Sequence, residues 1–241
     1  LGSLVAGVAH ELNTPIGNSL IVATTLRDMN REFRRKVSAG LRKSVLDEHV
    51  DETTYASDIL IRNLQRAAEL ISSFKQVAVD QTSSQRRKFD LAEVVNEIIV
   101  TMHPIFRKTS HIIETRIPAG ISMDSYPGPL GQVLTNLLNN AVLHAFDAQD
   151  EGLITLDAEL LADGAVSLSC RDNGCGIPAA NLKRIFDPFF TTKLGREGSG
   201  LGLNIVHNIV TGVLGGSIRV ESKERAGTTF TLTLPRQAPQ A

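Results

Sequence analysis

The segment AHELNTPIGN (residues 9–18) places an ionisable pair, His10 and Glu11, about one turn before Pro15. A neighbouring carboxylate can accept a hydrogen bond or a proton from one ring nitrogen, which leaves the other nitrogen nucleophilic. Thr14 adds a hydroxyl one turn after His10 on a helix. Pro15 cannot donate to the carbonyl of Glu11, so the helix is expected to bend there. These residues indicate a nucleophilic histidine on a bendable helix; an inert surface histidine beside an accidental kink is the alternative.

Asn136, Asn140 and His144 recur every four residues within the segment 129–146. On a helix this spacing forms a polar line along one side. Amides without charged neighbours are unusual on a solvated face, and asparagine carbonyl oxygens suit Mg²⁺ when water and phosphate oxygens complete its shell. The line therefore predicts a cation and phosphate site, with a plain solvated face as the alternative.

The segment DNGCGIP (residues 172–178) directly follows an expected strand. Asp172 would be fixed at the strand end, and Gly174 and Gly176 would let the backbone approach a ligand closely. A carboxylate in that position can accept a hydrogen bond from the exocyclic amine of adenine. An ordinary turn would use the same residues, so this segment alone does not decide between the two.

The aromatic segment FDPFFTTK (186–193) precedes GREGSGLGL (195–203), which is rich in glycine and opens a helix. Backbone N–H groups at such a helix start bind phosphate. The segment is not a Walker loop, because no GK[ST] follows, and it lacks the preceding strand of a Rossmann fingerprint. The order and spacing of these segments, more than any one of them, predict a nucleotide site.

Composition limits the remaining possibilities. The chain has 241 residues, 42% hydrophobic and 21% charged, with a net charge of −1. No basic field points to nucleic acid or an acidic membrane surface. Cys170 and Cys175 give no disulfide framework and predict a cytoplasmic protein. No apolar run approaches the roughly 20 residues that span a bilayer. Because the chain begins inside a periodic helix, we expect it to be the cytoplasmic portion of a larger protein.

Apolar residues in the segment 1–80 follow heptad-like spacings in two stretches, which predicts an all-α helical hairpin. Two such helices cannot bury both apolar seams alone, so a homodimer forming a four-helix bundle is expected. The charged connection from Arg31 to Glu52 is expected to form a frayed turn. Residues 81–89 lack the seam and are predicted to be a linker.

The periodicity changes from residue 90 onward. Asp90 with Glu93 forms a capping box for a helix that Pro104 should end or bend. A strand at 111–118, a helix at 129–146 and two hairpins in 153–235 follow. This pattern predicts an α+β sandwich over residues 90–236, with helices on one face of a mixed sheet. Residues 237–241 are expected to be a frayed tail.

Taken in order, these segments closely resemble those of the sensor histidine kinases of two-component systems. AHELNTP resembles the H box, NLLNNAVLHAF the N box, DNGCGIP the first glycine box, FDPFFTTK the F box, GSGLGL the second glycine box and AGTTFTLTLP the closing strand. The resemblance covers nearly the whole chain. It implies a dimerisation and phosphoacceptor hairpin followed by a catalytic ATP-binding domain of the Bergerat type.

The resemblance assigns roles to the first motif. His10 matches the phosphorylated histidine, and Glu11 matches the acid beside it. Thr14 fits the pattern E-x-x-T, in which the hydroxyl aligns a water that dephosphorylates the partner. The bend at Pro15 would let a signal offer His10 to the ATP-binding domain or withdraw it.

The resemblance also assigns a binding set for ATP and Mg²⁺. Asn140 matches the asparagine that binds Mg²⁺, Asn136 supports it, and His144 approaches the phosphates. Asp172 matches the aspartate that reads adenine. The other implied nucleotide-binding residues are Gly174, Gly176, Ile177, Arg184, Lys193, Gly198, Ser199, Gly200, Leu201, Gly202 and Thr228, with Thr229 on the same strand. The segment from Ile177 to Gly200 would order over the triphosphate as a lid.

The implied activity is ATP-dependent autophosphorylation of His10 and transfer to an aspartate of a separate response-regulator receiver domain, with phosphatase activity toward that receiver. Three alternatives stay open. Related ATPases place a water-activating glutamate where Asn136 stands, and an amide cannot act as that base. A protein that acts mainly as a phosphatase, or a scaffold that binds nucleotide only to set dimer geometry, would carry similar motifs.

Overall fold

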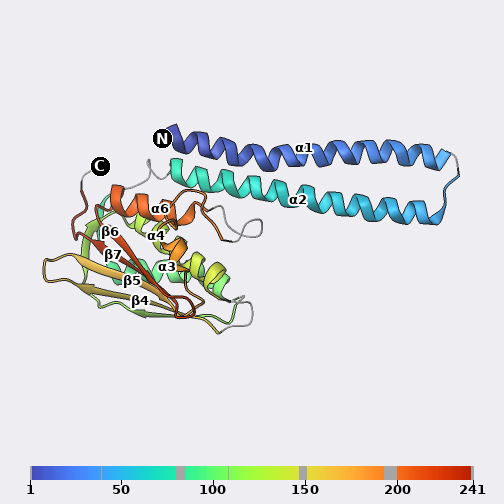
Figure 1. Cartoon of the computed structure of the whole chain (residues 1–241). Helices are drawn as coiled ribbons and strands as arrows, with labels where there is room; N and C mark the ends of the chain where they lie inside the picture. Colours follow the sequence, from blue (N-terminus) through green and yellow to red (C-terminus); the bar gives the residue numbers. More distant parts are fainter. Residues whose placement is uncertain are drawn as a thin grey trace. The chain divides into compact units, whose positions relative to one another are not determined.

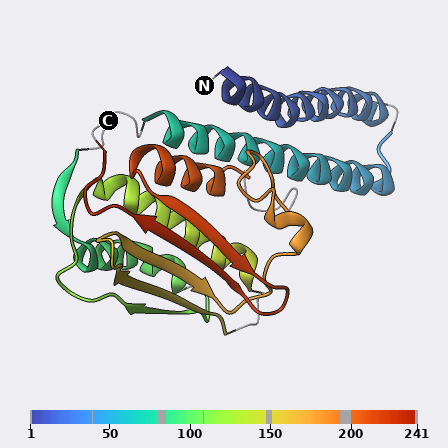
Figure 2. The same ribbon diagram turned by 60° about the vertical axis from the view of Figure 1, so that its left-hand side comes forward.

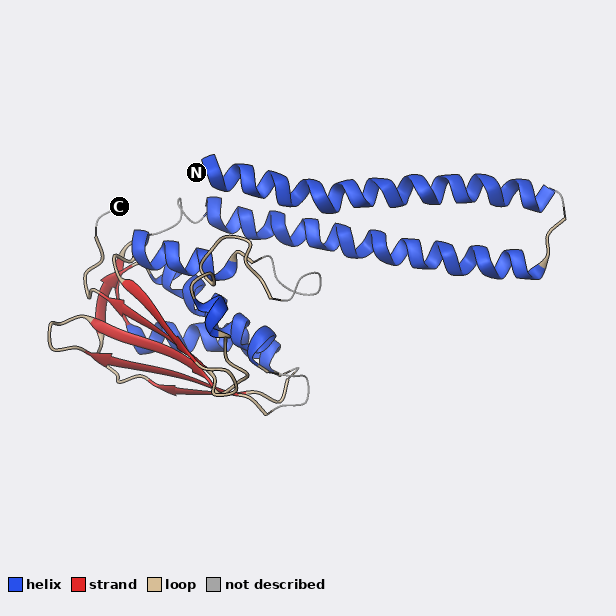
Figure 3. Ribbon diagram, in the orientation of Figure 1, coloured by secondary structure: helices blue, strands red, loops and turns tan. Residues whose placement is uncertain are grey.

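The computed structural model describes residues 2–38, 40–79, 85–107, 109–146, 151–192 and 200–239. The chain divides into two compact units, Leu1–Gln76 and Val77–Ala241. The first is a helical hairpin and the second combines a sheet with helices (Figures 1 and 3). This is the predicted fold class, and each unit is described by itself below.

The first unit consists of helices α1 (Gly2–Ser38) and α2 (Lys43–Val79), which run antiparallel (Figure 1). Helix α1 continues through Pro15 instead of stopping there, as the apolar pattern predicted. The hydroxyl of Ser19 donates to the carbonyl of Pro15 at 2.7 Å, one turn along the helix. The hairpin therefore carries the proline inside a continuous helix.

The expectation of a long frayed turn between the two helices is wrong. Both helices extend into the segment from Arg31 to Glu52, so that only residues 39–42 separate them. Contacts across the hairpin support this extension: the rings of Phe33 and His49 stack with centroids 3.9 Å apart. His49 Nε2 also lies 3.2 Å from Asn30 Oδ1. Charged residues that favour a turn in sequence thus lie here on the solvated faces of two packed helices.

The second unit is built on a five-stranded mixed sheet with strand order β2-β4-β5-β7-β6. Strand β2 pairs with β4 in parallel, and the other pairs are antiparallel. Two of these antiparallel pairs, β4–β5 and β6–β7, are the predicted hairpins. The strands are β2 (Ile112–Arg116), β4 (Leu153–Leu160), β5 (Val166–Asp172), β6 (Ser217–Ser222) and β7 (Thr228–Leu234). This register places Asp172 opposite Thr228 at the end of β5.

Helices cover one face of this sheet (Figure 2). They are α3 (Leu91–Phe106), α4 (Pro127–Asn140) and α6 (Gly202–Asn208), with the short α5 (Ala179–Leu182) before α6. Helices α4 and α6 each continue into one π-helical turn, η1 (Ala141–Ala145) and η2 (Ile209–Val213). The mixed sheet with helices on one face is the predicted arrangement.

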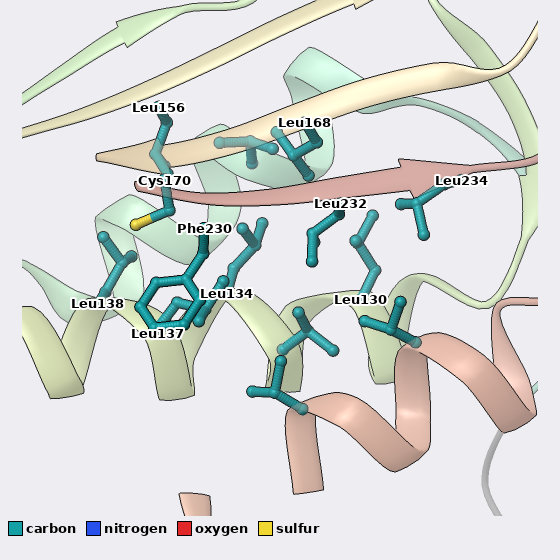
Figure 4. Close-up of a cluster of buried hydrophobic side chains, with 14 of the residues drawn as sticks. Leu130, Leu134, Leu137, Leu138, Leu156, Leu168, Cys170, Phe230, Leu232 and Leu234 are labelled. Atoms are coloured by element: carbon teal, nitrogen blue, oxygen red, sulfur yellow. The ribbon is translucent and has the colours of Figure 1, made fainter. Parts of the chain in front are cut away.

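The core lies between α4 and the sheet. Leu134, Leu137 and Leu138 of α4 are almost fully buried, as the helical pattern predicted. They face inward side chains of three adjacent strands, including Leu156, Leu168, Phe230 and Leu232 (Figure 4). Burial of large side chains is worth roughly 1.5–3 kcal/mol each. This packing fixes the face of α4 that carries the asparagines relative to the end of β5.

Asp90 caps helix α3 as predicted. Its carboxylate accepts from the backbone N–H groups of Ala92 at 2.9 Å and Glu93 at 3.4 Å. The other carboxylate oxygen accepts from the N–H of Gly120 at 2.8 Å. The helix passes Pro104 and ends two residues later, at Phe106.

The two ends of this unit are more ordered than the sequence suggested. Part of the predicted linker 81–89 forms strand β1 (Arg87–Asp90), which pairs antiparallel with β3 (Ser122–Ser125). The predicted tail is held as far as residue 239: Ala238 is buried and donates its N–H to the carbonyl of Asp124 at 3.0 Å. Strand β1 has only four residues, and the tail is joined to β3 by a single bridge between Asp124 and Gln237. Such short pairings leave little periodic signal in the sequence, which explains why neither was predicted.

Candidate nucleotide-binding site

A cavity of about 760 Å³ lies in the second unit, between helix α4, the segment after β5 and the start of α6. Its volume falls within the range of small-molecule sites, roughly 300–1,000 Å³. Segments far apart in the sequence line it together. The sequence-predicted residues among them are Asn136, Asn140, His144, Asp172, Gly176, Ile177, Gly200, Gly202 and Thr228.

The other predicted binding residues fall into two groups. Gly174, Leu201 and Arg184 are described but do not line the cavity. Lys193, Gly198 and Ser199 lie in the part of the expected lid, residues 193–199, that is outside the described residues. The roles of these residues stay predictions.

Asp172 is the buried acid of the site. It ends strand β5, and its exposed fraction is only 6%. Its Oδ1 accepts from the backbone N–H groups of Gly174 at 2.9 Å and Thr228 at 3.2 Å. Burial raises the pKa of Asp172, and these two hydrogen bonds oppose the rise. The carboxylate is thus held in one orientation at the wall of the cavity, where it can accept from a ligand.

The hydroxyl groups of Ser222 and Thr228 form a hydrogen-bond network next to Asp172. The hydroxyl of Ser222 hydrogen-bonds with that of Thr228 at 3.0 Å and donates to the carbonyl of Gly227 at 2.9 Å. It also accepts from the backbone N–H of Ile177 at 2.8 Å. Ser222 therefore ties the first glycine segment to β7. It was not predicted from the sequence, although its pairing with Thr228 in the last hairpin could have pointed to it.

The first glycine segment needs its small residues because other backbone packs against them. A side chain at Gly174 would collide with the carbonyl of Ala145, at the end of η1. Gly176 has φ +71°, and a side chain there would collide with the carbonyl of Lys223. The N–H of Cys175 donates to the Ala145 carbonyl at 2.8 Å. The loop is therefore closely packed on both sides, with its backbone at the cavity wall.

The asparagine line faces the start of α6. A methyl group added at Gly202 would lie 3.4 Å from Oδ1 of Asn136 and 3.8 Å from both amide atoms of Asn140. Asn136 uses its Nδ2 to donate to the carbonyl of Gln132 at 3.0 Å. Nδ2 of Asn140 is buried without a hydrogen-bond partner in the described part of the chain. A buried polar atom of this kind is costly unless a ligand or water completes it.

These residues fit Mg²⁺ only in part. The Asn140 amide can present its oxygen as a hard ligand, since the two ends of an amide are assigned from their surroundings. Within the described ranges, no cluster of three or more His, Cys, Asp or Glu residues could hold a metal ion. A magnesium ion here would therefore depend on phosphate and water oxygens for most of its shell.

The segment 184–190 packs against α6 and borders the cavity. Asn204 of α6 donates its Nδ2 to the carbonyl of Phe186 at 2.9 Å, and the rings of Phe186 and His207 lie 5.5 Å apart. Arg184 lies over the ring of Phe190 at 4.7 Å and 3.8 Å from a carboxylate oxygen of Asp187. Arg184, predicted to contact phosphate, is thus engaged within its own segment.

The predicted phosphoacceptor motif lies on α1, in the first unit. His10 falls within the helix, but its side chain lies outside what the structure describes. Glu11 is half-buried, and its Oε2 lies 3.9 Å from Nη2 of Arg66 on α2. Thr14 is exposed. Arg66 was not singled out from the sequence, because only the packing of the two helices brings it near Glu11.

Residues 126–238 match the family described as "Histidine kinase-, DNA gyrase B-, and HSP90-like ATPase". Among curated relatives, sensor histidine kinase ZraS of Escherichia coli (strain K12) is 32% identical over 247 residues, covering 100% of this chain and 47% of ZraS. The solved catalytic domain of histidine kinase ThkA is 30% identical with a TM-score of 0.56, covering 64% of this chain and 97% of that one. The chain belongs to the sensor histidine kinases.

Within this family, the chain spans about half the length of ZraS and a smaller share of RcsC of Salmonella typhimurium, which is 32% identical and of which it covers 23%. ThkA solved in complex with the response regulator TrrA shares the fold over 98% of this chain, with a TM-score of 0.66 and 24% identity. The described part of this histidine kinase chain contains no helix long and apolar enough to cross a membrane.

Proposed function

We propose that this chain is an ATP-dependent protein histidine kinase that phosphorylates His10. One observation carries the proposal: the buried carboxylate of Asp172 and the unpartnered amide nitrogen of Asn140 lie on the same cavity, which is large enough for a nucleotide. The first can accept from the exocyclic amine of adenine, and the second lies beside the glycine-rich start of α6. The cavity therefore offers one end to a base and the other to phosphates.

The proposed reaction needs little covalent chemistry from the cavity. A ring nitrogen of His10 attacks the γ-phosphorus, so an N–P bond forms while the bond to the bridging oxygen of ADP breaks. The ring proton passes to the carboxylate of Glu11 or to solvent. Catalysis would rest on alignment and charge neutralisation. Mg²⁺, when bound, would supply positive charge to the phosphates, and Asn140 is the protein group placed to hold it.

The residue at position 136 separates this activity from steady ATP hydrolysis. Asn136 lines the cavity, and its amide donates to the carbonyl of Gln132. An amide cannot remove a proton from water, so no general base stands at this position. We therefore expect transfer to a histidine to outpace hydrolysis.

The proposed acceptor of the phosphoryl group is an aspartate on a separate receiver domain. ThkA, whose fold this chain shares, has been solved in complex with a response regulator, which supports a partner of the same kind here. Removal of the phosphoryl group from the same partner is the second activity we propose. Thr14 supports it, because it is exposed on α1 one turn beyond His10.

We propose that the hairpin forms a homodimer. Large apolar side chains stay exposed along both helices, among them Leu20 at 68%, Ile21 at 64%, Ile61 at 51% and Leu64 at 50%. A second copy could cover them in a four-helix bundle. Cytoplasmic action is also proposed, because both cysteines, Cys170 and Cys175, are free thiols.

The test is labelling of the chain with ATP that carries a tagged γ-phosphate, in the presence of Mg²⁺. We expect a label that acid removes and base does not, and that disappears in His10→Ala. The variant should still bind nucleotide, because His10 lies outside the cavity-forming unit. A label that survives in His10→Ala would show that the acceptor is wrong. Tight ATP binding without any label in the wild type would favour a phosphatase or a scaffold.

A further inference from the structure

The turn between β6 and β7 brings two charged residues to the nucleotide cavity. Glu224 and Arg225 belong to this turn, and both line the cavity that Asp172 lines. Arg225 is exposed, and in the described part of the chain no carboxylate pairs with its guanidinium. The positive charge of Arg225 therefore lies at the edge of the cavity, and within the described residues it forms no ion pair.

The backbone holds Arg225 in a defined position. Its φ is +61°, in the left-handed region that a non-glycine residue rarely adopts. Such conformations persist where surrounding contacts impose them, often at functional sites. Here the N–H of Arg225 donates to the carbonyl of Cys175 at 2.6 Å. The strained turn is therefore fastened directly to the first glycine segment.

Neighbouring contacts place this turn at the base-reading end of the cavity. The carbonyl of Lys223 packs against Gly176, and Gly227 packs against the carbonyl of Asp172. The turn thus lies against both ends of the segment from 172 to 176. The phosphate end, by contrast, is formed by Asn136 and Asn140 with Gly202.

We propose that Arg225 contacts the purine ring, with its planar guanidinium stacked on the base at the open edge of the cavity. This rests on the proposed nucleotide binding and assigns a further specificity-determining residue to it. A guanidinium plane stacks on aromatic rings and is more weakly hydrated than an ammonium group. Arg225 would then strengthen binding of the nucleoside itself, independently of the phosphates.

The experiment measures dissociation constants for ATP and for adenosine on the whole chain, for the wild type, Arg225→Ala and Arg225→Lys. Cation–π contacts imply a loss of about 5-fold to 20-fold for Arg225→Ala. The loss should be equal for ATP and adenosine, since both carry the base. Arg225→Lys should recover only part of it, because an ammonium group cannot stack as a plane.

Lys223→Ala is the matched control, because Lys223 lies in the same turn without lining the cavity; its affinities should be unchanged. A loss confined to ATP would show that Arg225 contacts phosphate and would overturn the proposal. Unchanged affinities in Arg225→Ala would also overturn it. If the wild type binds neither ligand, the proposed function itself fails. Equal melting temperatures would show that the variants are folded.

Discussion

Arg86 donates two hydrogen bonds to the carboxylate of Asp124, from Nε at 2.9 Å and from Nη2 at 3.0 Å. Asp124 lies in β3, and its backbone also bonds on the other side of the strand. Its N–H donates to the carbonyl of Arg236 at 2.7 Å, and its carbonyl accepts from Ala238. One residue therefore fastens both the incoming chain and the outgoing chain of the second unit.

The first prediction concerns this pair. The hydrogen bonds from Arg86 lower the pKa of Asp124. The pair therefore stabilises the fold at pH values above the ordinary aspartate pKa of 3.8. That contribution is lost as the pH falls through the lowered value. Asp124→Asn should lower the melting temperature at pH 7. In acid, the difference in melting temperature between the variant and the wild type should become smaller. Glu114→Gln, which breaks the more exposed pair with Arg116, should change little.

The second prediction concerns Asp172. Asp172→Asn should weaken ATP binding by about 10-fold to 100-fold, as expected when a charged hydrogen-bond acceptor is lost. Because burial raises the Asp172 pKa, wild-type affinity should fall with decreasing pH before ordinary carboxylates titrate. Titration calorimetry across pH checks both points. Equal affinities of the two proteins would show that this carboxylate does not read the base.

Asp172→Asn should weaken ATP binding but should not lower the stability of the fold. A raised folded-state pKa means that the ionised carboxyl group destabilises the fold at neutral pH. The amide of Asp172→Asn can still accept from Gly174 and Thr228. Urea unfolding without nucleotide should therefore show the variant to be at least as stable as wild type at pH 7.

A third prediction tests the approach of α6 to the asparagines. Gly202→Ala would place a methyl group in van der Waals contact with Oδ1 of Asn136, at 3.4 Å, in the space between α6 and the asparagines, and should reduce nucleotide affinity and His10 labelling together. Gly212→Ala is the matched control, because nothing lies within 4 Å of a methyl group there. Labelling by the control should match wild type. Full labelling by Gly202→Ala would mean that Asn136 and Asn140 do not handle phosphates.

The fourth prediction concerns the serine beneath the site. Ser222→Ala removes the hydroxyl that joins Thr228, Gly227 and Ile177, and leaves the N–H of Ile177 without its partner. A lost partner of this kind costs about 1–3 kcal/mol. Urea unfolding should show that loss, along with weaker ATP binding. Ser217→Ala, at the exposed start of the same strand, should show neither.

Sequence periodicity and motif order predicted the large elements of the fold. The alternation in 153–172 and 217–234 and the buried face of α4 follow local rules, and the structure has them as expected. Asp172, Asn140 and Gly202 were found because their motifs are local too. Ser222 and Arg225 escaped notice, since their importance comes from which loops touch after folding. The short β1 and the bridged tail escaped for the same reason.

Strand β3 has a mechanical consequence. The chain enters the second unit along one side of β3 as β1 and leaves it along the other side at residues 236–238. Because β1 runs antiparallel to β3 and residues 236–238 run parallel to it, both chain ends leave from the Ser125 end of β3. A tension applied between the helical hairpin and anything attached after residue 239 would therefore peel these two flanking segments apart from that end. Its path would run through the small β1–β3 sheet and bypass the five strands that hold Asp172. The ATP-binding domain could thus be pulled at both ends without its cavity being deformed.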